Sequence, residues 1–336
     1  MLSKITVSPA PHISQPLSTR RIMGDVLIAL VPAMIAATVF FRARALLVIG
    51  VCVAACVLSE WLCNRIRKQP ASVGDLSAAV TGVILALSLP PTVPLSVAII
   101  GSAFAIVIAK MVFGGLGANI FNPAMAGRAF MVASFGVAMT TWTVPATVDT
   151  QMPTITAANA DTVTQATPLA WSKDLQRSDA EPAEVNQQIP WAFLGHIGGC
   201  LGETSGLALL LGGAYLLIRR TIMWHLPAAV LLAAGGVALM AWLINPDGFA
   251  NPLLHLFGGG LMIGAFFIAT DPVTAPLSVR GMWIFGAGIG ALVMLIRIVG
   301  EYPEGVMYAV LIMNAFTPLI DRFCKLTPAG GVPNGG

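Results

Sequence analysis

Apolar residues occur along this chain in long runs separated by short stretches that contain charged residues, proline or glycine. Ten such runs are present, at about 22–41, 45–62, 76–89, 95–113, 124–142, 203–218, 224–244, 253–269, 281–299 and 304–320. Membrane-spanning helices need about 20 apolar residues each, so these runs predict an all-α polytopic integral membrane protein with about ten spans. The third run is short and ends at Pro90 and Pro91. We therefore expect a tilted, broken or re-entrant helix there.

The composition supports a membrane protein and excludes a soluble globular one. Of the 336 residues, 57% are hydrophobic and only 10% are charged, whereas soluble domains carry about 25% charged residues. The net charge of +3 is small and dispersed, so we expect no nucleic-acid partner. The five cysteines form no CxxC pair and the histidines no i, i+4 pair, so no metal site is expected.

The charged residues between the runs predict how the chain is oriented in the membrane. Counting loops alternately from a cytoplasmic N-terminus places twelve basic residues inside: Lys4, Arg20, Arg21, Arg65, Arg67, Lys68, Lys110, Arg219, Arg220, Arg280, Arg322 and Lys325. Only Arg42, Arg44, Lys173 and Arg177 fall outside. This asymmetry agrees with the excess of Lys and Arg in cytoplasmic loops, so we place both termini in the cytoplasm and residues 143–189 on the other side.

An internal repeat divides the membrane part into two halves. Residues 90–97 read PPTVPLSV and residues 272–279 read PVTAPLSV, an offset of 182 that also relates Gly82 to Gly264. Each half contains five runs, an odd number, so the second half enters the membrane in the opposite sense. We therefore predict an inverted 5+5 repeat. Its parts are a tail (1–21), a first repeat (22–142), an extracytoplasmic loop (143–189), a second repeat (190–322) and a C-terminal tail (323–336).

The extracytoplasmic loop contains a candidate attachment site. Residues 161–167 read DTVTQAT and resemble the flavinylation motif, in which Asp is followed after two residues by Ser or Thr, a small residue, Ala and the acceptor Thr. The matching positions are Asp161, Thr164, Ala166 and Thr167, and the resemblance implies that a flavin transferase joins FMN through its phosphate to the Thr167 hydroxyl. We expect that hydroxyl to be exposed on flexible backbone. Gln165 stands where Gly or Ser is usual, which predicts slower flavinylation.

Most of the chain resembles one family. The segments GANIFNPAMAGRAF (117–130), GETSGLALLLGG (202–213) and IATDPVTAPLS (268–278) resemble the NqrB/RnfD family. This family includes the RnfD/RsxD subunit of the Rnf ion-translocating electron-transport complex and the B subunit of the sodium-pumping NADH:quinone reductase. The opening segment of about 20 residues favours the RnfD branch.

The family resemblance implies a function and a cellular location. It implies an electron-transfer subunit in a complex that exchanges electrons between ferredoxin and NAD⁺ and moves Na⁺ or H⁺. Its partners would be membrane lipid and the other subunits, among them a second flavoprotein and iron–sulfur subunits. It would lie in the bacterial inner membrane, with residues 143–189 in the periplasm.

A second cluster is expected on the cytoplasmic side, where Asn119 and Asn122 can meet Asp271 although the two segments are far apart in the chain. Amide and carboxylate groups suit the carbonyls and ring N–H at the edge of a flavin. Resemblance to the quinone-reductase relative implies noncovalent riboflavin at these positions. Asn-Pro and Asp-Pro pairs also cap helix ends and break loops. The residues leave both interpretations open.

Several charged residues lie in or near the apolar runs. Glu203 and Thr204 fall on the same side as Thr167, where they are candidates to line an FMN pocket or an ion path. Asp25 and Asp75 lie near helix starts, where the helix dipole favours a carboxylate, and we prefer that structural role for both. Two arginines, Arg128 and Arg297, fall inside or at the edge of spans, and we expect them to pair with acids or helix ends.

The alternative function is a secondary transporter or channel for a small solute. Inverted repeats with broken helices are typical of that class. In that case the threonine-rich loop would be a plain linker.

Overall fold

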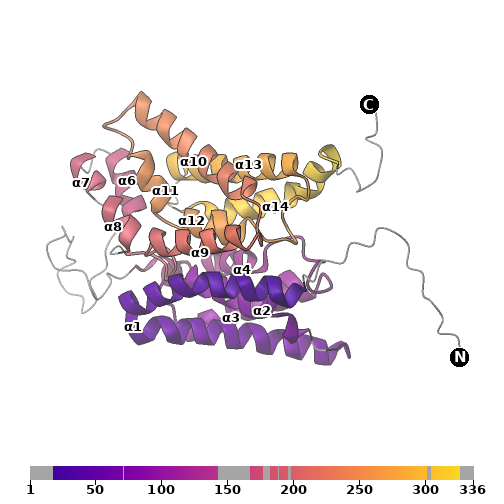
Figure 1. The fold of residues 1–336 in the computed structure, drawn as a ribbon. Helices are drawn as coiled ribbons and strands as arrows, with labels where there is room; N and C mark the ends of the chain where they lie inside the picture. Colours follow the sequence, from indigo (N-terminus) through magenta and orange to yellow (C-terminus); the bar gives the residue numbers. More distant parts are fainter. Residues whose placement is uncertain are drawn as a thin grey trace, which may run out of the picture.

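The computed structural model describes residues 18–70, 72–142, 167–176, 182–187, 189–195, 198–300 and 304–325, and all regular structure in these residues is helical. The helices pack in layers (Figure 1). Helices α1, α2 and α3 form one side of the molecule, α10 and α13 form the other, and α4, α9 and α12 lie between them.

The N-terminal half consists of seven elements. They are α1 (Thr19–Ile66), the 3-10 turn η1 (Val73–Asp75), α2 (Ser77–Leu87), α3 (Leu95–Ile106), the π-helical turn η2 (Val107–Met111), α4 (Pro123–Ser134) and α5 (Gly136–Thr140). Three short helices follow, α6 (Pro168–Gln176), α7 (Pro182–Asn186) and α8 (Ile189–Leu194). The remaining elements are α9 (Gly206–Ile218), α10 (His225–Ile244), α11 (Pro252–Phe257), α12 (Leu261–Ile263), the π-helical turn η3 (Gly264–Ile268), α13 (Val279–Val299) and α14 (Val306–Phe323).

Helix α1 is two helices joined by a sharp turn. Its 48 residues are interrupted at Arg42, whose backbone has φ 54° and ψ −144°. The chain reverses there and runs back along itself (Figure 1). Arg44 fixes the turn to the loop before α3 by donating hydrogen bonds to the carbonyl oxygens of Pro91 (3.0 Å) and Val93 (2.7 Å). The two halves correspond to the predicted runs 22–41 and 45–62.

Polar residues mark where several helices begin. The side chain before the first turn accepts a hydrogen bond from a backbone N–H inside the helix at five positions: Ser18, Asn122, Ser205, Asn251 and Ser278. The N–H groups of a first helical turn have no partner within the helix, and such caps satisfy one of them. These residues therefore determine the starts of α1, α4, α9, α11 and α13.

Glycine allows the long helices to touch backbone to backbone. A Cβ atom added at Gly290 in α13 would clash with the carbonyl oxygen of Val230 in α10. One added at Gly212 in α9 would clash with the carbonyl oxygen of Ala29 in α1. Small residues at such crossings are typical of membrane helix packing, where dispersion contacts replace the hydrophobic effect.

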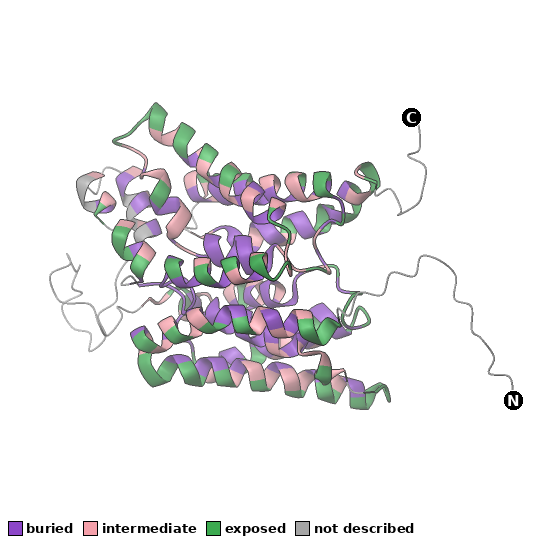
Figure 2. Cartoon of the chain, in the orientation of Figure 1, coloured by how far each residue is buried: buried purple, intermediate pink, exposed green. Residues whose placement is uncertain are grey.

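The outer surface is apolar. Figure 2 shows exposed residues along the outer faces of the helices, and on α10 these include Leu232, Leu239 and Leu243, which are 66%, 45% and 64% exposed. Four helices, α1, α10, α13 and α14, are long and apolar enough to cross a membrane, and α2, α3 with η2, and α9 are shorter apolar helices. The chain is a multi-pass membrane protein.

Each predicted apolar run contains helix, but the run 124–142 is divided into α4 and α5, and the run 253–269 is interrupted as well. The run 76–89 ends as a helix at Leu87, ahead of the two prolines, as expected for a short helix. The run 253–269 is broken into α11, α12 and η3, because Gly258, Gly259 and Gly260 separate the first two and Gly259 has φ +68°. The number of spans and the inverted repeat stay predictions.

The two ends of the bundle carry different parts of the chain. Helices α6, α7 and α8 lie together at one end, and the first turn of α1 and the last turn of α14 lie at the other (Figure 1). The candidate sites described next lie toward these two ends.

Candidate functional site

A pocket lies near the first turn of α1. Small-molecule sites commonly have mostly apolar walls with a few polar groups. The apolar wall includes Ile22, Met23, Val80, Ile84, Leu116, Leu216, Ile222, Phe266 and Phe267. The polar wall includes Ser77, Lys110, Asn119, Asn122, Thr221, Thr270 and Asp271. We call this cavity the Asn–Asp pocket after Asn119, Asn122 and Asp271.

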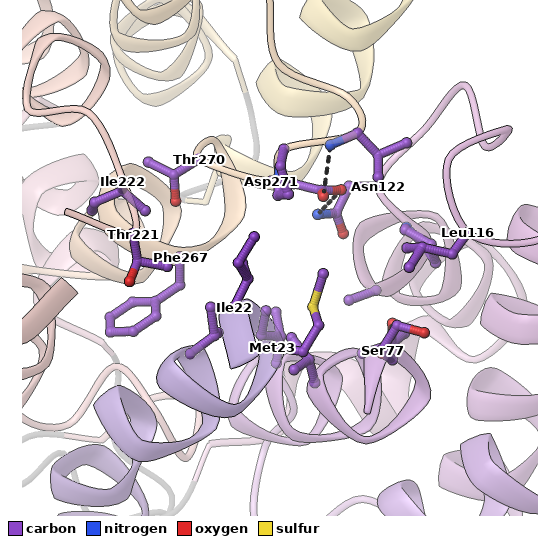
Figure 3. Close-up of a pocket in the computed structure, with 18 of the residues that line it drawn as sticks. Ile22, Met23, Ser77, Leu116, Asn122, Thr221, Ile222, Phe267, Thr270 and Asp271 are labelled. Atoms are coloured by element: carbon purple, nitrogen blue, oxygen red, sulfur yellow. Dashed lines mark hydrogen bonds between the residues drawn. The ribbon is translucent and has the colours of Figure 1, made fainter. Parts of the chain in front are cut away.

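The expected meeting of Asn122 with Asp271 is confirmed. The Nδ2 atom of Asn122 donates a hydrogen bond to Oδ2 of Asp271 at 3.4 Å, across 149 residues of sequence. Figure 3 shows the Asn122 amide directed at the Asp271 carboxylate, with Ile22 and Met23 on the opposite side of the cavity. This hydrogen bond therefore connects the start of α4 to the loop after η3 at one wall of the pocket.

Both residues also cap local structure, as the alternative interpretation proposed. Asn122 Oδ1 accepts from the backbone N–H of Met125 in the first turn of α4. Asp271 accepts from the N–H of Val273 and from the hydroxyl of Thr274. Burial raises the pKa of Asp271, and these two hydrogen bonds oppose the rise. Capping and pocket lining are therefore compatible, because the atoms that cap also hold the two segments together at the cavity.

Asn119 differs from Asn122 because one of its polar atoms is left free. It is buried, and its Nδ2 donates to the carbonyl oxygen of Phe121 at 3.1 Å. Its Oδ1 atom is buried without a hydrogen-bond partner among the described residues. Buried polar atoms in folded proteins almost always have a partner. A ligand with an N–H group, as at the edge of a flavin ring, would supply the missing donor.

A buried ion pair beside the pocket was missed by the sequence analysis. Lys110 donates to Glu60 Oε2 at 2.7 Å and to the hydroxyl of Ser77 at 2.6 Å, and Lys110 and Glu60 are 1% and 0% exposed. Counting Lys110 as a cytoplasmic loop charge was therefore wrong: it is a buried, paired residue in η2. Charges inside apolar runs are costly and mark functional positions, and that rule would have selected Lys110 and Glu60 from the runs 95–113 and 45–62.

Thr167 begins a helix. Its Oγ1 atom accepts from the N–H of Ala170 at 3.2 Å, and Pro168 follows as the first residue of α6. Because Thr167 is only 8% exposed, the expectation of an exposed hydroxyl was wrong. The hydroxyl is at a helix N-terminus, a position that favours phosphate groups. The other predicted motif positions, Asp161, Thr164 and Ala166, and also Gln165, lie outside the described residues.

Helix α6 is anchored to the membrane helices. Lys173 donates to the carbonyl oxygen of Gly300 at the end of α13. Leu169 is buried against the turn between α11 and α12, where a Cβ added at Gly259 would lie 2.5 Å from its Cδ1 atom. Thr167 is thereby held close to the chain that contains Gly260.

Four charged side chains meet next to that turn. Arg128 NH2 lies 3.9 Å from Glu203 Oε1 and 3.7 Å from Glu304 Oε2, and Arg297 NH2 lies 3.8 Å from Glu304 Oε1. We call these four residues the Arg–Glu cluster. The expected pairing of both arginines with acids is confirmed, whereas Glu304 had not been singled out in the sequence analysis. Thr204 is buried, but its hydroxyl donates to the carbonyl oxygen of Leu201 and not to the cluster.

The two glutamates of the cluster have opposite electrostatic environments. Burial, together with the neighbouring Glu304, raises the pKa of Glu203 well above its usual value. Burial disfavours the ionised form of Glu304 as well, but interaction with the neighbouring Glu203 carboxyl and the guanidinium groups of Arg128 and Arg297 lower its pKa overall. Glu203 therefore favours the protonated form and Glu304 the ionised form.

Asp25 and Asp75, which the sequence analysis assigned to helix starts, have different roles in the structure. Asp75 accepts a hydrogen bond from the N–H of Ser77 at 2.7 Å at the start of α2, as the helix-start interpretation predicted. Asp25 instead connects α1 to the end of α9 through Tyr215 (3.2 Å), Arg219 (3.4 Å) and Thr221 (3.4 Å), so a helix-start role for Asp25 was wrong.

The chain is similar to known proteins of one family. Residues 6–330 match the family described as NQR2, RnfD, RnfE. The chain is 42% identical to the D subunit of the ion-translocating oxidoreductase complex of Yersinia pseudotuberculosis, over 96% of this chain and 97% of that protein. It is equally similar to the D subunit of the Na(+)-translocating ferredoxin:NAD(+) oxidoreductase complex of Acetobacterium woodii (42%, covering 96% and 94%). The corresponding protein of the proton-translocating complex of Clostridium ljungdahlii is also 42% identical, covering 95% and 94%.

Proposed function

The chain belongs to the NQR2, RnfD, RnfE family as a subunit of an ion-translocating oxidoreductase complex, and from this premise we propose that it relays electrons through two bound flavins. FMN is attached to Thr167, and riboflavin binds without a covalent bond in the Asn–Asp pocket. The observation that carries the proposal is the buried, unpartnered Oδ1 atom of Asn119 at the wall of the Asn–Asp pocket. Bound flavins supply one- and two-electron transfer, while the protein supplies position and electrostatics.

The residues of the Asn–Asp pocket have separate tasks in this proposal. Asn119 accepts a hydrogen bond from the ring N–H, and Asn122 with Asp271 holds the two segments at the ring edge. Lys110, held by Glu60 and Ser77, presents its ammonium group at the wall, and the Glu60 carboxylate compensates its charge.

The attachment of FMN at Thr167 requires its helix cap to open. The Thr167 hydroxyl accepts from Ala170 and is largely buried, so a flavin transferase reaches it only when α6 is released from α11 and α13. A phosphate attached to Thr167 would lie near the N-terminus of α6, where the helix dipole would favour its negative charge. The transferase would recognise the other motif residues, Asp161, Thr164 and Ala166.

We also propose that the membrane part is an inverted 5+5 repeat. The two PLSV loops lie at opposite ends of the bundle: Arg44 binds Pro91 and Val93 beside the turn in α1, whereas Pro272 lines the Asn–Asp pocket with Ile22. This placement supports opposite orientations of the halves. The chain would lie in a bacterial inner membrane with both termini in the cytoplasm and residues 143–189 in the periplasm.

The complex moves either Na⁺ or H⁺, since relatives of equal similarity are named for each. Electrons would pass to and from a second flavoprotein and iron–sulfur subunits. The family match favours an electron-transfer subunit over the transporter or channel alternative.

Covalent attachment is tested by in-gel fluorescence. The protein, coexpressed with its flavin transferase, is denatured, separated and viewed under ultraviolet light. The wild type should give a fluorescent band, Thr167→Ser should keep it, and Thr167→Ala should lose it. Thr162→Ala is the matched control, because this threonine lies in the same loop but outside the motif positions. A band that persists in Thr167→Ala contradicts the assignment.

The noncovalent flavin is tested by extraction. Mild denaturation of the native complex should release riboflavin, and Asp271→Asn should lower the yield, because the carboxylate that holds Asn122 is lost. An unchanged yield would exclude this carboxylate from the site.

A further inference from the structure

The largely buried carboxyl groups of Glu203 and Glu304 approach the same residue, Gly260, near helix α6. A Cβ atom added at Gly260 would lie 3.1 Å from Glu203 Oε1 and 3.3 Å from Glu304 Oε1. Glu203 precedes α9 and Glu304 precedes α14, so two segments separated by about 100 residues supply the pair. A side chain at position 260 would press on both carboxyl groups.

The two arginines of the cluster do not hydrogen-bond these carboxyl groups. The three Arg–Glu distances of 3.7–3.9 Å exceed the roughly 2.7–2.9 Å of a charge-assisted hydrogen bond. Arg297 donates instead to the carbonyl oxygens of His255 (2.5 Å) and Gly258 (3.1 Å). Arg128 NH2 lies 3.4 Å from Cys200 Sγ.

The oxygen atoms of the glutamates are unequally satisfied. Both oxygens of Glu304 accept from the N–H of Gly260, at 3.2 and 3.3 Å. Glu203 Oε2 accepts only a long hydrogen bond from the N–H of Cys200, and its Oε1 is buried without a partner in the described residues. Two ionised carboxylates in this arrangement would repel each other with an unpaired oxygen between them.

We propose that Glu203 and Glu304 hold one proton between them, which makes the Arg–Glu cluster a proton-binding site. A proton on Glu203 turns its carboxyl group into a donor to Glu304 and removes the repulsion. The cluster then carries two guanidinium charges and one carboxylate charge, an excess of one positive charge. The opposite pKa shifts of the two glutamates agree with this arrangement.

The surrounding charges favour a proton over a metal cation. The titratable and charged groups that act directly on the pair are Arg128 in α4, Cys200 before α9 and Arg297 in α13. Tyr308 in α14 acts on Arg128, and His255 in α11 lies near Arg297 and Lys173. The charged members are cationic and repel a sodium ion. A shared proton needs no further oxygen ligands and is therefore the ligand that these neighbours permit.

The proton site borders the segment that carries Thr167. Leu169 and Arg297 both approach Gly259, next to Gly260. If Thr167 carries FMN, as proposed above, negative charge gained by the flavin stabilises the proton on the pair, and the proton in turn favours the reduced flavin, because coupling between two sites is reciprocal. This coupling step alone rests on the proposed function.

The test is infrared spectroscopy of the complete complex in membranes, which detects the C=O stretch of a protonated carboxyl group. The wild type should show a band that disappears as the pH is raised. Glu203→Gln and Glu304→Gln should each remove it, because a single remaining carboxyl group beside two arginines ionises. Asp25→Asn, a change at a buried carboxylate paired with Arg219, should leave the band unchanged.

The outcomes separate the proton site from the flavin. In Thr167→Ala the band should persist, but its change between the oxidised and reduced complex should be lost. A band that survives Glu304→Gln overturns the shared proton, because it then belongs to Glu203 alone. Loss of the band on adding Na⁺ at constant pH also overturns it. If the wild type carries fluorescent flavin on Thr167 but its band is the same in the oxidised and reduced complex, only the coupling is overturned.

Discussion

The side-chain oxygen of Asn119 is the most informative single atom of the Asn–Asp pocket. It is buried and unpartnered among the described residues, so a bound donor gains a hydrogen bond without displacing another. We predict that Asn119→Ala weakens riboflavin binding about 2- to 10-fold, the factor expected for the net loss of one hydrogen bond. Fluorescence titration of flavin-depleted complex measures the affinity. Asn245→Ala is the matched control, since Asn245 also bonds only local backbone but lies on the exposed surface; equal weakening by both changes would contradict the assignment.

The Lys110–Glu60 pair makes a prediction about stability. Removing one partner of a buried ion pair leaves an uncompensated charge, which costs about 3–5 kcal/mol, whereas removing both charges is often neutral. Lys110→Met should therefore lower the thermal unfolding temperature of the detergent-solubilised chain, because Glu60 loses its 2.7 Å partner. The double variant Lys110→Met, Glu60→Gln should recover most of the loss. A double variant as unstable as Lys110→Met would show that the charge is not the cause.

At the scale of helices, the contact between α10 and α13 depends on glycine. A methyl group at Gly290 would clash with the carbonyl oxygen of Val230, whereas one at Gly236 in α10 meets nothing within 4 Å. Gly290→Ala should cost about 1–3 kcal/mol, because overpacking separates the helices. Gly236→Ala should be neutral or stabilising by up to about 1 kcal/mol, because alanine favours helix. Thermal unfolding of both variants in one detergent is the measurement, and equal effects would exclude the close contact as the reason.

The helices themselves were predictable from the sequence, because apolar runs and their Pro and Gly boundaries are local signals. The two-segment contact of Asn122 with Asp271 was predictable as well, because alternate counting of the runs puts both at the same end of the bundle. The Lys110–Glu60 pair was not, since the residues are 50 positions apart and each looks like an isolated charge. The burial of Thr167 was missed because a Thr-Pro helix start inside a polar loop resembles a turn.

At the scale of the whole molecule, the two candidate sites occupy opposite ends of the bundle. The Asn–Asp pocket lies by the first turn of α1, and Thr167 with the Arg–Glu cluster lies by α6 and the break between α11 and α12. An electron relay across the membrane requires centres toward both faces, and the two flavins proposed above would meet this requirement. The proposed relay therefore depends on which side of the membrane each end of the bundle lies.

Labelling of single cysteines tests the orientation. The exposed residue Gln187 lies by α7, and the exposed residue Lys68 follows α1 at the other end, where Thr19 and Gln69 line one hollow. Cys52, Cys56 and Cys200 are buried, so replacing Cys63 and Cys324 by serine leaves a background in which the native thiols are shielded.

In intact cells a membrane-impermeant maleimide should label Gln187→Cys, because we place α7 in the periplasm. It should label Lys68→Cys only after the inner membrane is permeabilised, because Lys68 belongs to the basic segment assigned to the cytoplasm by the excess of Lys and Arg on that side. The reverse pattern would invert the orientation and move the FMN site to the cytoplasm. Labelling of both positions in intact cells would contradict a bundle whose two ends lie on opposite sides of the membrane.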